Sequence, residues 1–266
     1  MSVGPPRQEG GNTAGKPWFR RWSRVPRAAY RLVCFPHAGG SASFFREWAD
    51  GLPEAEVLAV CYPGRAERIG EPLAEDLPML ARDIAGALGE FADLPLTLFG
   101  HSMGAPIALE TARALEASGV PVAHLFASGS RDAPLPEAAQ EPDEEQVVVE
   151  ELLSMGGTSH DMMDDALFRE LVLPYVMGDA RLYHGYRMPA QPLLRCPVTV
   201  VTGDRDENTD RRPWTSLTTA SVAQVTVPGG HFYLTEEPPH ELLRAAMSAA
   251  GQTGTGVPTA IDGSRS

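Results

Sequence analysis

The chain of 266 residues contains 22 basic and 35 acidic residues, a formal net charge of −13, and 43% hydrophobic residues. This hydrophobic content is enough for a folded core and excludes disorder throughout the chain. The acidic balance argues against nucleic acid as a partner, because such binding depends on basic residues that neutralise phosphates. No apolar run reaches the roughly 18 residues that span a bilayer, and no apolar signal segment follows the amino terminus. Three cysteines form no disulfide framework, so we expect a cytoplasmic protein without a membrane partner.

The composition divides the chain into one domain with two polar ends. Residues 1–17 predict a disordered leader, residues 18–250 a single α/β domain, and residues 251–266 a disordered tail. Short apolar runs indicate buried strands at Arg31–Phe35, Val57–Tyr62, Leu96–Phe99, Val122–Ala127, Val198–Thr202 and Ala223–Val227. Helical patterns separate most of them, at Phe44–Gly51, Leu73–Phe91, Ala105–Ser118 and His240–Ala250. This alternation predicts a mostly parallel central sheet flanked by helices.

One long interval interrupts the alternation. About 65 residues separate two successive predicted strands, from Arg131 to Arg195, which is far longer than an ordinary crossover. The interval holds helical patterns at Gln146–Ser154 and Asp165–Met177, an acidic run at Glu141–Glu145 and five of the nine methionines. We therefore expect an inserted helical lid at about residues 133–195, with a poorly ordered insertion as the alternative.

The pattern Gly-x-Ser-x-Gly occurs at Gly100–Gly104, with Ser102 at its centre. A predicted strand precedes it and a predicted helix follows, which is the context that a nucleophilic serine on a sharp turn requires. The flanking glycines avoid collisions in this turn, and the helix amino terminus favours negative charge. The amide of Met103 is then placed to donate to an oxyanion. The alternative is a glycine-flanked serine in a loop.

A serine nucleophile needs a base and an acid that orients the base. His231 follows the last predicted strand in a glycine-rich loop, where parallel sheets bind ligands, and it is the expected base. Asp206, at the tip of the loop after the fifth predicted strand, is the expected acid. Asp132 remains an alternative acid, and for Asp204 we expect a local turn bond.

The loop after the first predicted strand, Phe35-Pro-His-Ala-Gly-Gly40, is expected to supply the second oxyanion donor, the amide of Ala38. His37 in this loop has no accompanying metal-binding cluster, so we expect a structural role for it and no metal site.

These motifs together resemble those of the discrete type II thioesterases that accompany polyketide synthases and nonribosomal peptide synthetases. The resemblance rests on Trp18–Trp22, Phe35–Gly40, Tyr62–Arg68, Gly100–Ala105, Thr202–Asp206 and Gly229–Phe232, and it covers about residues 18–245. It implies an α/β-hydrolase fold with a mobile helical lid and an acid at Asp206. It also implies hydrolysis of acyl groups from the phosphopantetheine arm of acyl or peptidyl carrier proteins, which clears stalled or misprimed synthases.

The resemblance implies that the protein needs no cofactor of its own, because the substrate carries the phosphopantetheine. We expect a monomer that meets its carrier domain transiently, and no fused carrier motif is present, so the chain resembles a freestanding enzyme. The alternatives are a small-molecule carboxylesterase or lipase, a thioesterase dedicated to product release or acyl transfer, and a noncatalytic carrier-binding module. Comparison of carrier-bound and oxyester substrates separates the first, and labelling of Ser102 with a fluorophosphonate separates the last.

The carrier encounter is expected to depend on salt. Residues 1–31 contain seven basic residues and one acidic residue, and Arg65 adds to the expected basic surface. Arg65 and Arg68 either contact the pantetheine phosphate or carrier acids, or pair with the local Glu67 and Glu71.

Overall fold

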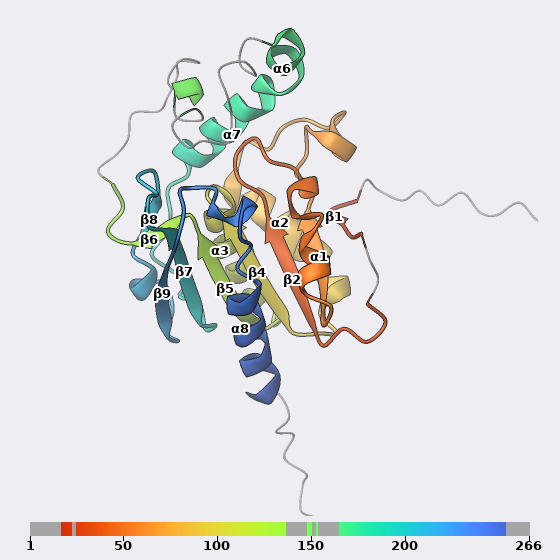
Figure 1. The fold of residues 1–266 in the computed structure, drawn as a ribbon, viewed down its shortest axis with the longest axis vertical. Coiled ribbons are helices and arrows are strands. Elements are labelled where there is room, and N and C mark those ends of the chain that lie inside the picture. Colours follow the sequence, from red (N-terminus) through yellow and green to blue (C-terminus); the bar gives the residue numbers. More distant parts are fainter. Residues whose placement is uncertain (1–16, 23–24, 137–147, 151–152, 154–164, 254–266) are drawn as a thin grey trace, which may run out of the picture.

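The computed structural model describes residues 17–22, 25–136, 148–150, 153 and 165–253. At its centre lies a seven-stranded sheet in the order β1-β3-β2-β4-β5-β7-β9 (Figure 1). The strands are β1 (Phe19–Arg20), β2 (Tyr30–Phe35), β3 (Ala55–Val60), β4 (Leu96–His101), β5 (Val122–Ser128), β7 (Val198–Gly203) and β9 (Val222–Val227). All neighbouring strands are parallel except β1, which runs antiparallel to β3. The mostly parallel sheet predicted from the sequence is confirmed.

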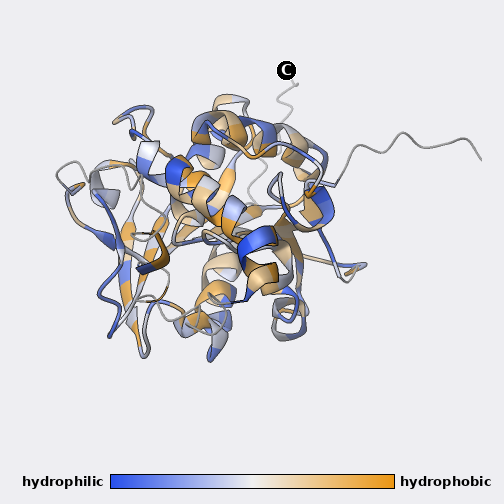
Figure 2. Cartoon of the chain, turned by 90° about the horizontal axis from the view of Figure 1, so that it is seen from above, coloured by the Kyte–Doolittle hydropathy of each residue, from blue (hydrophilic) through white to orange (hydrophobic). Residues whose placement is uncertain are grey.

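Side chains alternate between the two faces of this sheet, so each face has its own core. On β2, Val33 and Phe35 pack into one apolar cluster, whereas Leu32 and Cys34 pack into the other. The first cluster is covered by α2 (Leu77–Leu88) and α3 (Gly104–Ala117), and the second by α1 (Trp48–Gly51) and α8 (His240–Thr253). Figure 2 shows both hydrophobic and hydrophilic segments on the helices, as expected for helices with one face on the sheet.

Two predicted helices are shorter than their apolar patterns. The predicted helix Leu73–Phe91 begins only at Leu77, because the Asp76 carboxylate accepts a hydrogen bond from the Met79 amide (2.6 Å) and caps the first turn. It ends in a 3-10 turn at Gly89–Phe91. The predicted helix Phe44–Gly51 divides into a 3-10 turn at Ala42–Phe45 and the short α1.

Two further strands, too short to show a periodic pattern, were not predicted. They are β6 (Ser130–Asp132) and β8 (Asp210–Arg212), which pair in parallel as a separate two-stranded sheet. Residue 131 of β6 lies opposite residue 211 of β8. The pairing holds the segment after β5 against the segment after β7.

The long interval between β6 and β7 contains helices, as the sequence predicts. The predicted helix Asp165–Met177 is found as α6 (Ala166–Leu171) and α7 (Leu173–Gly185), which lie beyond the carboxyl ends of the parallel strands (Figure 1). The predicted helix Gln146–Ser154 is described only at residues 148–150 and 153, which are helical. The acidic run Glu141–Glu145 lies outside the described residues, as do the tail from residue 254 and the leader up to residue 16.

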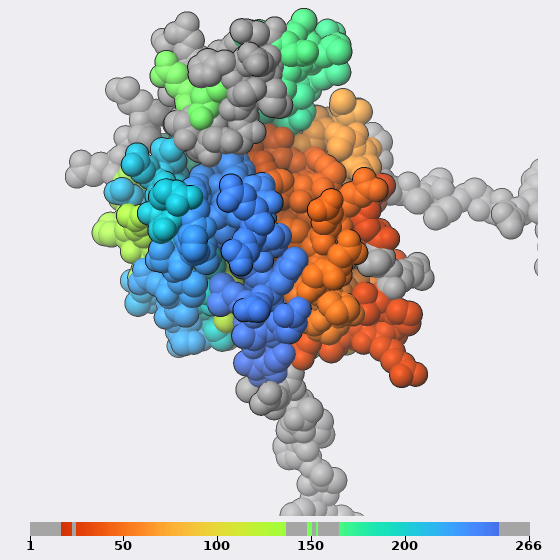
Figure 3. Space-filling model, viewed as in Figure 1, coloured from red at the N-terminus to blue at the C-terminus, as the bar shows by residue number. Residues whose placement is uncertain are grey.

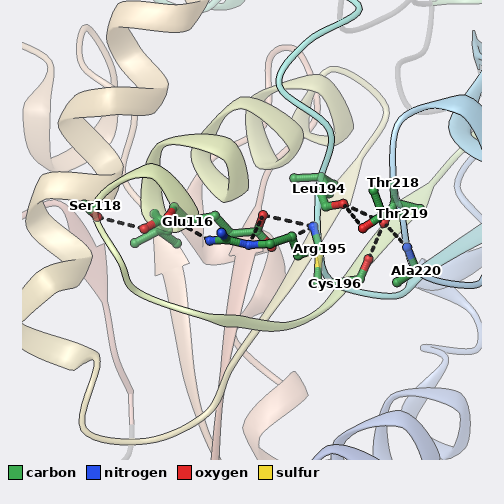
Figure 4. A network of polar contacts seen from close by, with 9 residues as sticks. Glu116, Ser118, Leu194, Arg195, Cys196, Thr218, Thr219 and Ala220 are labelled. Carbon is green, nitrogen blue, oxygen red and sulfur yellow. Dashed lines mark hydrogen bonds and ion pairs between the residues drawn. The ribbon is translucent and has the colours of Figure 1, made fainter.

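A polar network fixes the place where the interval returns to the sheet (Figure 4). The Glu116 carboxylate at the end of α3 accepts from the amide of Arg195 (3.0 and 3.1 Å), and the Arg195 guanidinium donates to the Glu116 carbonyl (2.9 Å). The Thr218 hydroxyl donates to the carbonyl of Cys196 (2.8 Å). Hydrogen bonds to Glu116 and to Thr218 therefore fix the residues that immediately precede β7.

Segments from opposite ends of the described chain lie side by side. The α8 guanidinium of Arg244 donates to the Glu54 carboxylate (2.9 Å) and to the Gly51 carbonyl (2.8 Å), and Figure 3 shows α8 (blue) against the amino-terminal segment (orange). All three cysteines are free and buried, as expected. No described helix is long and apolar enough to cross a membrane.

Because α8 covers one face of the sheet, truncation of its core side chain should destabilise the fold. Leu243 is fully buried, so Leu243→Ala is expected to lower the free energy of unfolding by about 2–4 kcal/mol. The matched control, Leu167→Ala on α6, removes a side chain that is 65% exposed and should change it by less than about 0.5 kcal/mol. Urea unfolding measures both, and equal losses would contradict this description of the core.

Candidate active site

Ser102 lies on the sharp turn between β4 and α3. Its φ angle is +54°, a left-handed conformation that non-glycine residues rarely adopt. Backbone hydrogen bonds hold this conformation: the Ser102 amide donates to the Ser128 carbonyl on β5 (2.8 Å), and the Ala105 amide donates to the Ser102 carbonyl (2.9 Å). The strand-turn-helix context predicted for the Gly-x-Ser-x-Gly motif is present.

The two glycines of the motif allow three backbone segments to meet. A Cβ atom on Gly100 would overlap the carbonyl of Gly104, and a Cβ atom on Gly104 would overlap the carbonyl of Phe35 at the end of β2. Because the obstacles are backbone atoms, no side-chain rotation relieves either collision. The turn therefore requires glycine at both positions, as inferred from the sequence.

His231 and Asp206 come together from neighbouring loops. The His231 ring nitrogen Nδ1 lies 2.9 Å from the Asp206 carboxylate oxygen Oδ2, and both residues are 4% exposed. The Asp206 amide donates to the Gly203 carbonyl (3.2 Å), and its other carboxylate oxygen accepts from the Asn208 amide (3.0 Å). The buried His231 Nε2 has no hydrogen-bond partner within the described part of the chain. One ring nitrogen is thus oriented by a carboxylate and the other remains available.

The two other candidate acids bind elsewhere. Instead of the local turn bond expected for Asp204, its carboxylate accepts from the amide of Gly229 (2.8 Å), two residues before His231. That expectation was wrong because Gly229, with φ +124°, brings its backbone across to the Asp204 loop. Asp132 accepts from the amide and the hydroxyl of Thr215.

Two amides near Ser102 have no acceptor among the residues that the structure describes. Ala38 and Met103 line the same cavity as Ser102, and no hydrogen bond from either amide is found among the described residues. The neighbouring amides are satisfied, since Gly40 donates to the His37 carbonyl (3.0 Å) and Gly39 donates to the Asp179 carboxylate (2.8 Å). Two amides of residues that line the cavity with Ser102 are thus left without a protein acceptor in the described part of the chain.

A buried ion pair joins the Ala38 loop to α7. The Arg65 guanidinium makes a two-pronged contact with the Asp179 carboxylate, with Nη1 at 2.5 Å from Oδ2. Arg65 also donates to the Gly40 carbonyl (3.2 Å), and its charged carbon lies 4.7 Å from the centre of the Tyr175 ring. Since Asp179 also binds the Gly39 amide, this pair holds both glycines of the loop.

The expected basic surface at Arg65 is therefore wrong. Arg65 and Arg68 are 4% and 6% exposed, so neither is available to a carrier surface. Arg68 pairs with Glu71 and stacks over Trp18 at 3.9 Å, as the local alternative predicted for it. The partner of Arg65 lies 114 residues away and was not among the carboxylates considered.

Sequence reasoning missed a polar cluster beneath the serine turn. His101 Nδ1 lies 2.9 Å from the Ser128 hydroxyl, which lies 2.8 Å from the Tyr233 hydroxyl, and the His101 and His231 rings are 5.0 Å apart. Burial lowers the pKa of His101 well below its usual value, and the charge on a protonated His231 lowers it further. The only signal was the position of His101 inside the motif, because Ser128 lies on β5 and Tyr233 lies in the 3-10 turn Tyr233–Thr235, both far away in the sequence.

His37 has the structural role expected from the sequence. Its ring packs edge-on against Phe44 and Phe232, with both centroid distances 4.8 Å. Burial, together with the charges of His231 and Arg65, lowers the pKa of His37 to about 3, so the ring is neutral at physiological pH. The described residues include no cluster of His, Cys, Asp or Glu that could hold a metal ion.

A cavity of about 500 Å³ opens beside Ser102. Its apolar lining comes from both the core domain and α7, including Met103, Val176, Ala180 and Phe232. Its polar lining includes Tyr183 and Arg212. Ser102 and the residues of the two amides line this chamber, while His231 is not among its lining residues. A serine with an oriented histidine and amide donors is the set of groups that acyl transfer from an ester or thioester requires.

The sheet order, the serine turn and the His231–Asp206 pair define an α/β hydrolase. The thioesterase domain family matches residues 30–248, so the chain belongs to the thioesterase family. It is 38% identical to a probable cadicidin biosynthesis thioesterase of Streptomyces griseus over 82% of this chain, and 36% identical to thioesterase PikA5 of Streptomyces venezuelae over 83% of this chain and 81% of that protein. The solved structure of BorB, a type II thioesterase from the borrelidin biosynthetic cluster, is similar with a TM-score of 0.74 and 34% identity, covering 89% of this chain and all of that one.

Coverage differs among these relatives. The chain spans 62% of the length of the cadicidin thioesterase and 17% of the phenyloxazoline synthase MbtB of Mycobacterium tuberculosis, to which it is 37% identical over 89% of its own length. The thioesterase unit thus occurs both in small proteins and within a large synthase.

The collisions at the serine turn give a direct test. Gly104→Ala places a Cβ against the backbone of Phe35 and should lower the free energy of unfolding by about 2–4 kcal/mol, as expected for overpacking against backbone. The control Gly86→Ala adds a Cβ within α2, where nothing lies within 4 Å, and should raise stability by up to about 1 kcal/mol. Chemical denaturation compares them, and a neutral Gly104→Ala would contradict the described packing.

The Arg65–Asp179 pair should show the energetics of a buried charge. Asp179→Ala leaves the Arg65 guanidinium buried without its carboxylate and should cost about 3–5 kcal/mol of unfolding free energy. The double variant Arg65→Met/Asp179→Leu removes both charges and should recover most of that loss. If the double variant is no more stable than Asp179→Ala, the two residues do not act as a pair.

Proposed function

We propose that this protein is a serine thioesterase that hydrolyses acyl groups from the phosphopantetheine arm of acyl or peptidyl carrier domains, with Ser102, His231 and Asp206 as its catalytic residues. The observation that carries the proposal is the buried His231, which Asp206 holds at Nδ1 and whose Nε2 has no partner among the described residues. Its ring lies 5.0 Å from that of His101, the residue that precedes the left-handed Ser102. Membership of the thioesterase family supports the choice of a thioester as substrate.

His231 removes the hydroxyl proton through Nε2 as Ser102 Oγ attacks the thioester carbonyl. The carbonyl oxygen becomes an oxyanion that accepts from the amides of Ala38 and Met103. Asp206 keeps His231 in the tautomer that has a free Nε2 and stabilises the protonated ring. The imidazolium returns its proton to the departing pantetheine sulfur, and an acyl-serine remains.

Water completes the cycle. His231 takes a proton from a water molecule, the resulting hydroxide attacks the acyl-serine, and the proton passes to Ser102 Oγ as the acid leaves. The same two amides stabilise the second oxyanion. The chain supplies every group in this sequence, so no cofactor is required beyond the phosphopantetheine of the substrate.

The biological role that fits best is editing of stalled or misprimed synthases. BorB is described as a type II thioesterase from a biosynthetic cluster, and its likeness to this chain supports that role. Residues 133–195 act as the lid in this proposal, because the α7 residues Val176 and Ala180 line the cavity beside Ser102. A cytoplasmic monomer that binds its carrier domain transiently suits an enzyme that serves many stalled sites.

Substitution of the proposed catalytic residues tests the mechanism. Ser102→Ala and His231→Ala should each lower kcat for an acyl-carrier thioester by about 10³–10⁶, and Asp206→Asn by about 10²–10⁴, because each removes a member of one unit. Hydrolysis is followed by release of the free carrier thiol, and a fluorophosphonate reports the reactivity of Ser102 in parallel.

The matched control is Asp132→Asn, which changes the alternative acid that binds Thr215 instead of His231. It should leave kcat within about threefold of the unmodified protein. Near-normal turnover by Ser102→Ala would end the proposal. Faster hydrolysis of oxyesters than of acyl-carrier thioesters would favour a carboxylesterase instead, and action only on full-length product chains would favour a releasing role.

A further inference from the structure

A buried cation stands in the wall of the cavity that holds Ser102. Strand β8 alternates its side chains, so Asp210 and Arg212 face inward, 7% and 5% exposed, while Arg211 between them is exposed. Arg212 lines the same cavity as Ser102. Nothing in the proposed catalytic cycle uses this arginine.

The Asp210 carboxylate is fully engaged by neighbouring groups. Its Oδ2 accepts from the Ser130 hydroxyl (3.0 Å) and from Nε of Arg212 (3.0 Å), and its Oδ1 accepts from the Tyr183 hydroxyl (2.6 Å). Trp214 donates to the same Ser130 hydroxyl (2.9 Å). Asp210 is thereby fixed, and it fixes the inner end of the Arg212 guanidinium.

Two aromatic rings border the rest of the guanidinium. Its central carbon lies 5.3 Å from the centre of the Tyr186 ring and 5.8 Å from that of Tyr183. Burial opposes the positive charge, but Asp210 and the two tyrosines outweigh it and raise the pKa of Arg212. The side chain therefore stays cationic within the wall.

The outer end of the guanidinium keeps unused donors. Among the described residues, Nε of Arg212 donates to Asp210, and the guanidinium also has a hydrogen-bonding contact with the Tyr183 side chain. Nη1 and Nη2 together carry four N–H groups. A charged donor in a low-dielectric chamber gains most from an oxygen acceptor, and loses most when an apolar chain displaces its water.

We propose that Arg212 is a substrate-recognition residue that donates from Nη1 and Nη2 to an uncharged oxygen, keto or hydroxyl, carried by the acyl chain beyond its thioester carbonyl. This inference rests on the proposed thioesterase function. The acceptor is uncharged because Asp210 already neutralises Arg212, so this buried guanidinium offers hydrogen bonds and no net charge. Arg187 and Arg211, which line the same cavity, are exposed to solvent. The preferred substrate is thus an oxygenated acyl chain, in preference to the saturated chain of equal length.

A matched series of pantetheine thioesters tests the proposal. The series is octanoyl together with eight-carbon chains that differ only in the position of one keto group, plus an eight-carbon chain that ends in a carboxylate. The best keto isomer should exceed octanoyl in kcat/KM by about tenfold, the discrimination expected of one hydrogen bond from a charged donor. Arg212→Met should reduce this ratio to about one.

Two further variants keep the test decisive. The double variant Asp210→Asn/Arg212→Met removes both charges and leaves no unpaired buried carboxylate, so it serves if the single variant fails to fold. In it too, kcat/KM should be the same for the keto isomers and for octanoyl. Arg131→Met removes an exposed arginine on the neighbouring β6 and should retain it. Fluorophosphonate labelling of Ser102 confirms that each variant has a folded site.

The outcomes separate this inference from the proposed function. If the unmodified protein hydrolyses no thioester, the proposed function itself fails. If it hydrolyses octanoyl and all keto isomers equally well, or if the keto preference survives in both Arg212 variants, the recognition role is wrong while the thioesterase function stands. A preference for the carboxylate-ended chain would overturn the uncharged acceptor.

Discussion

The whole site depends on how closely three backbone segments approach one another at the serine turn. The end of β2, the end of β4 and the first turn of α3 meet where Gly100 and Gly104 leave no room for a Cβ atom. This close approach holds Ser102 at a φ of +54° and places it in the lining of the cavity. It also places the Ala38 loop, which follows β2, against the amino terminus of α3. The positions of these two amides, which have no acceptor among the described residues, therefore follow from backbone packing.

Two buried arginine–carboxylate pairs organise the chamber above this turn. Arg65–Asp179 joins the Ala38 loop to α7, and Arg212–Asp210 stands in the chamber wall. In each pair one carboxylate oxygen also accepts a bond from a group outside the pair, the Gly39 amide or the Tyr183 hydroxyl. A buried ion pair contributes little net stability when compared with apolar residues of the same shape, but it specifies one arrangement. These pairs set the relative positions of α7, β8 and the Ala38 loop, which apolar contacts alone leave less defined.

The main features of the fold were predictable because their signals are local. Six strands appear as apolar runs, and the serine motif requires its own strand and helix. The expected burial of the last of them was wrong, because β9 lies at the edge of the sheet and none of its residues is buried. The strands of two or three residues, β1, β6 and β8, carry no period and were missed. Of the candidate site, the pairing of His231 with Asp206 followed from two loops at the same sheet edge. The partner of Arg65 did not, because Asp179 lies on a helix 114 residues away whose orientation no local pattern predicts. The same holds for Ser128 and Tyr233 under His101, and for the bond between Asp204 and Gly229.

Two aspartates hold the loop that carries His231, and only one of these contacts depends on the charge of the histidine ring. Asp206 contacts the imidazole itself, so that contact strengthens each time the ring gains a proton and weakens when the proton leaves. Asp204 holds a neutral amide of the same loop, and this bond does not respond to the ring's charge. The histidine loop therefore has one hydrogen bond of constant strength, from the Gly229 amide to Asp204, and one whose strength varies with protonation, between His231 and Asp206. In the proposed cycle the ring gains a proton twice and loses it twice, while the backbone that carries it keeps the same restraint.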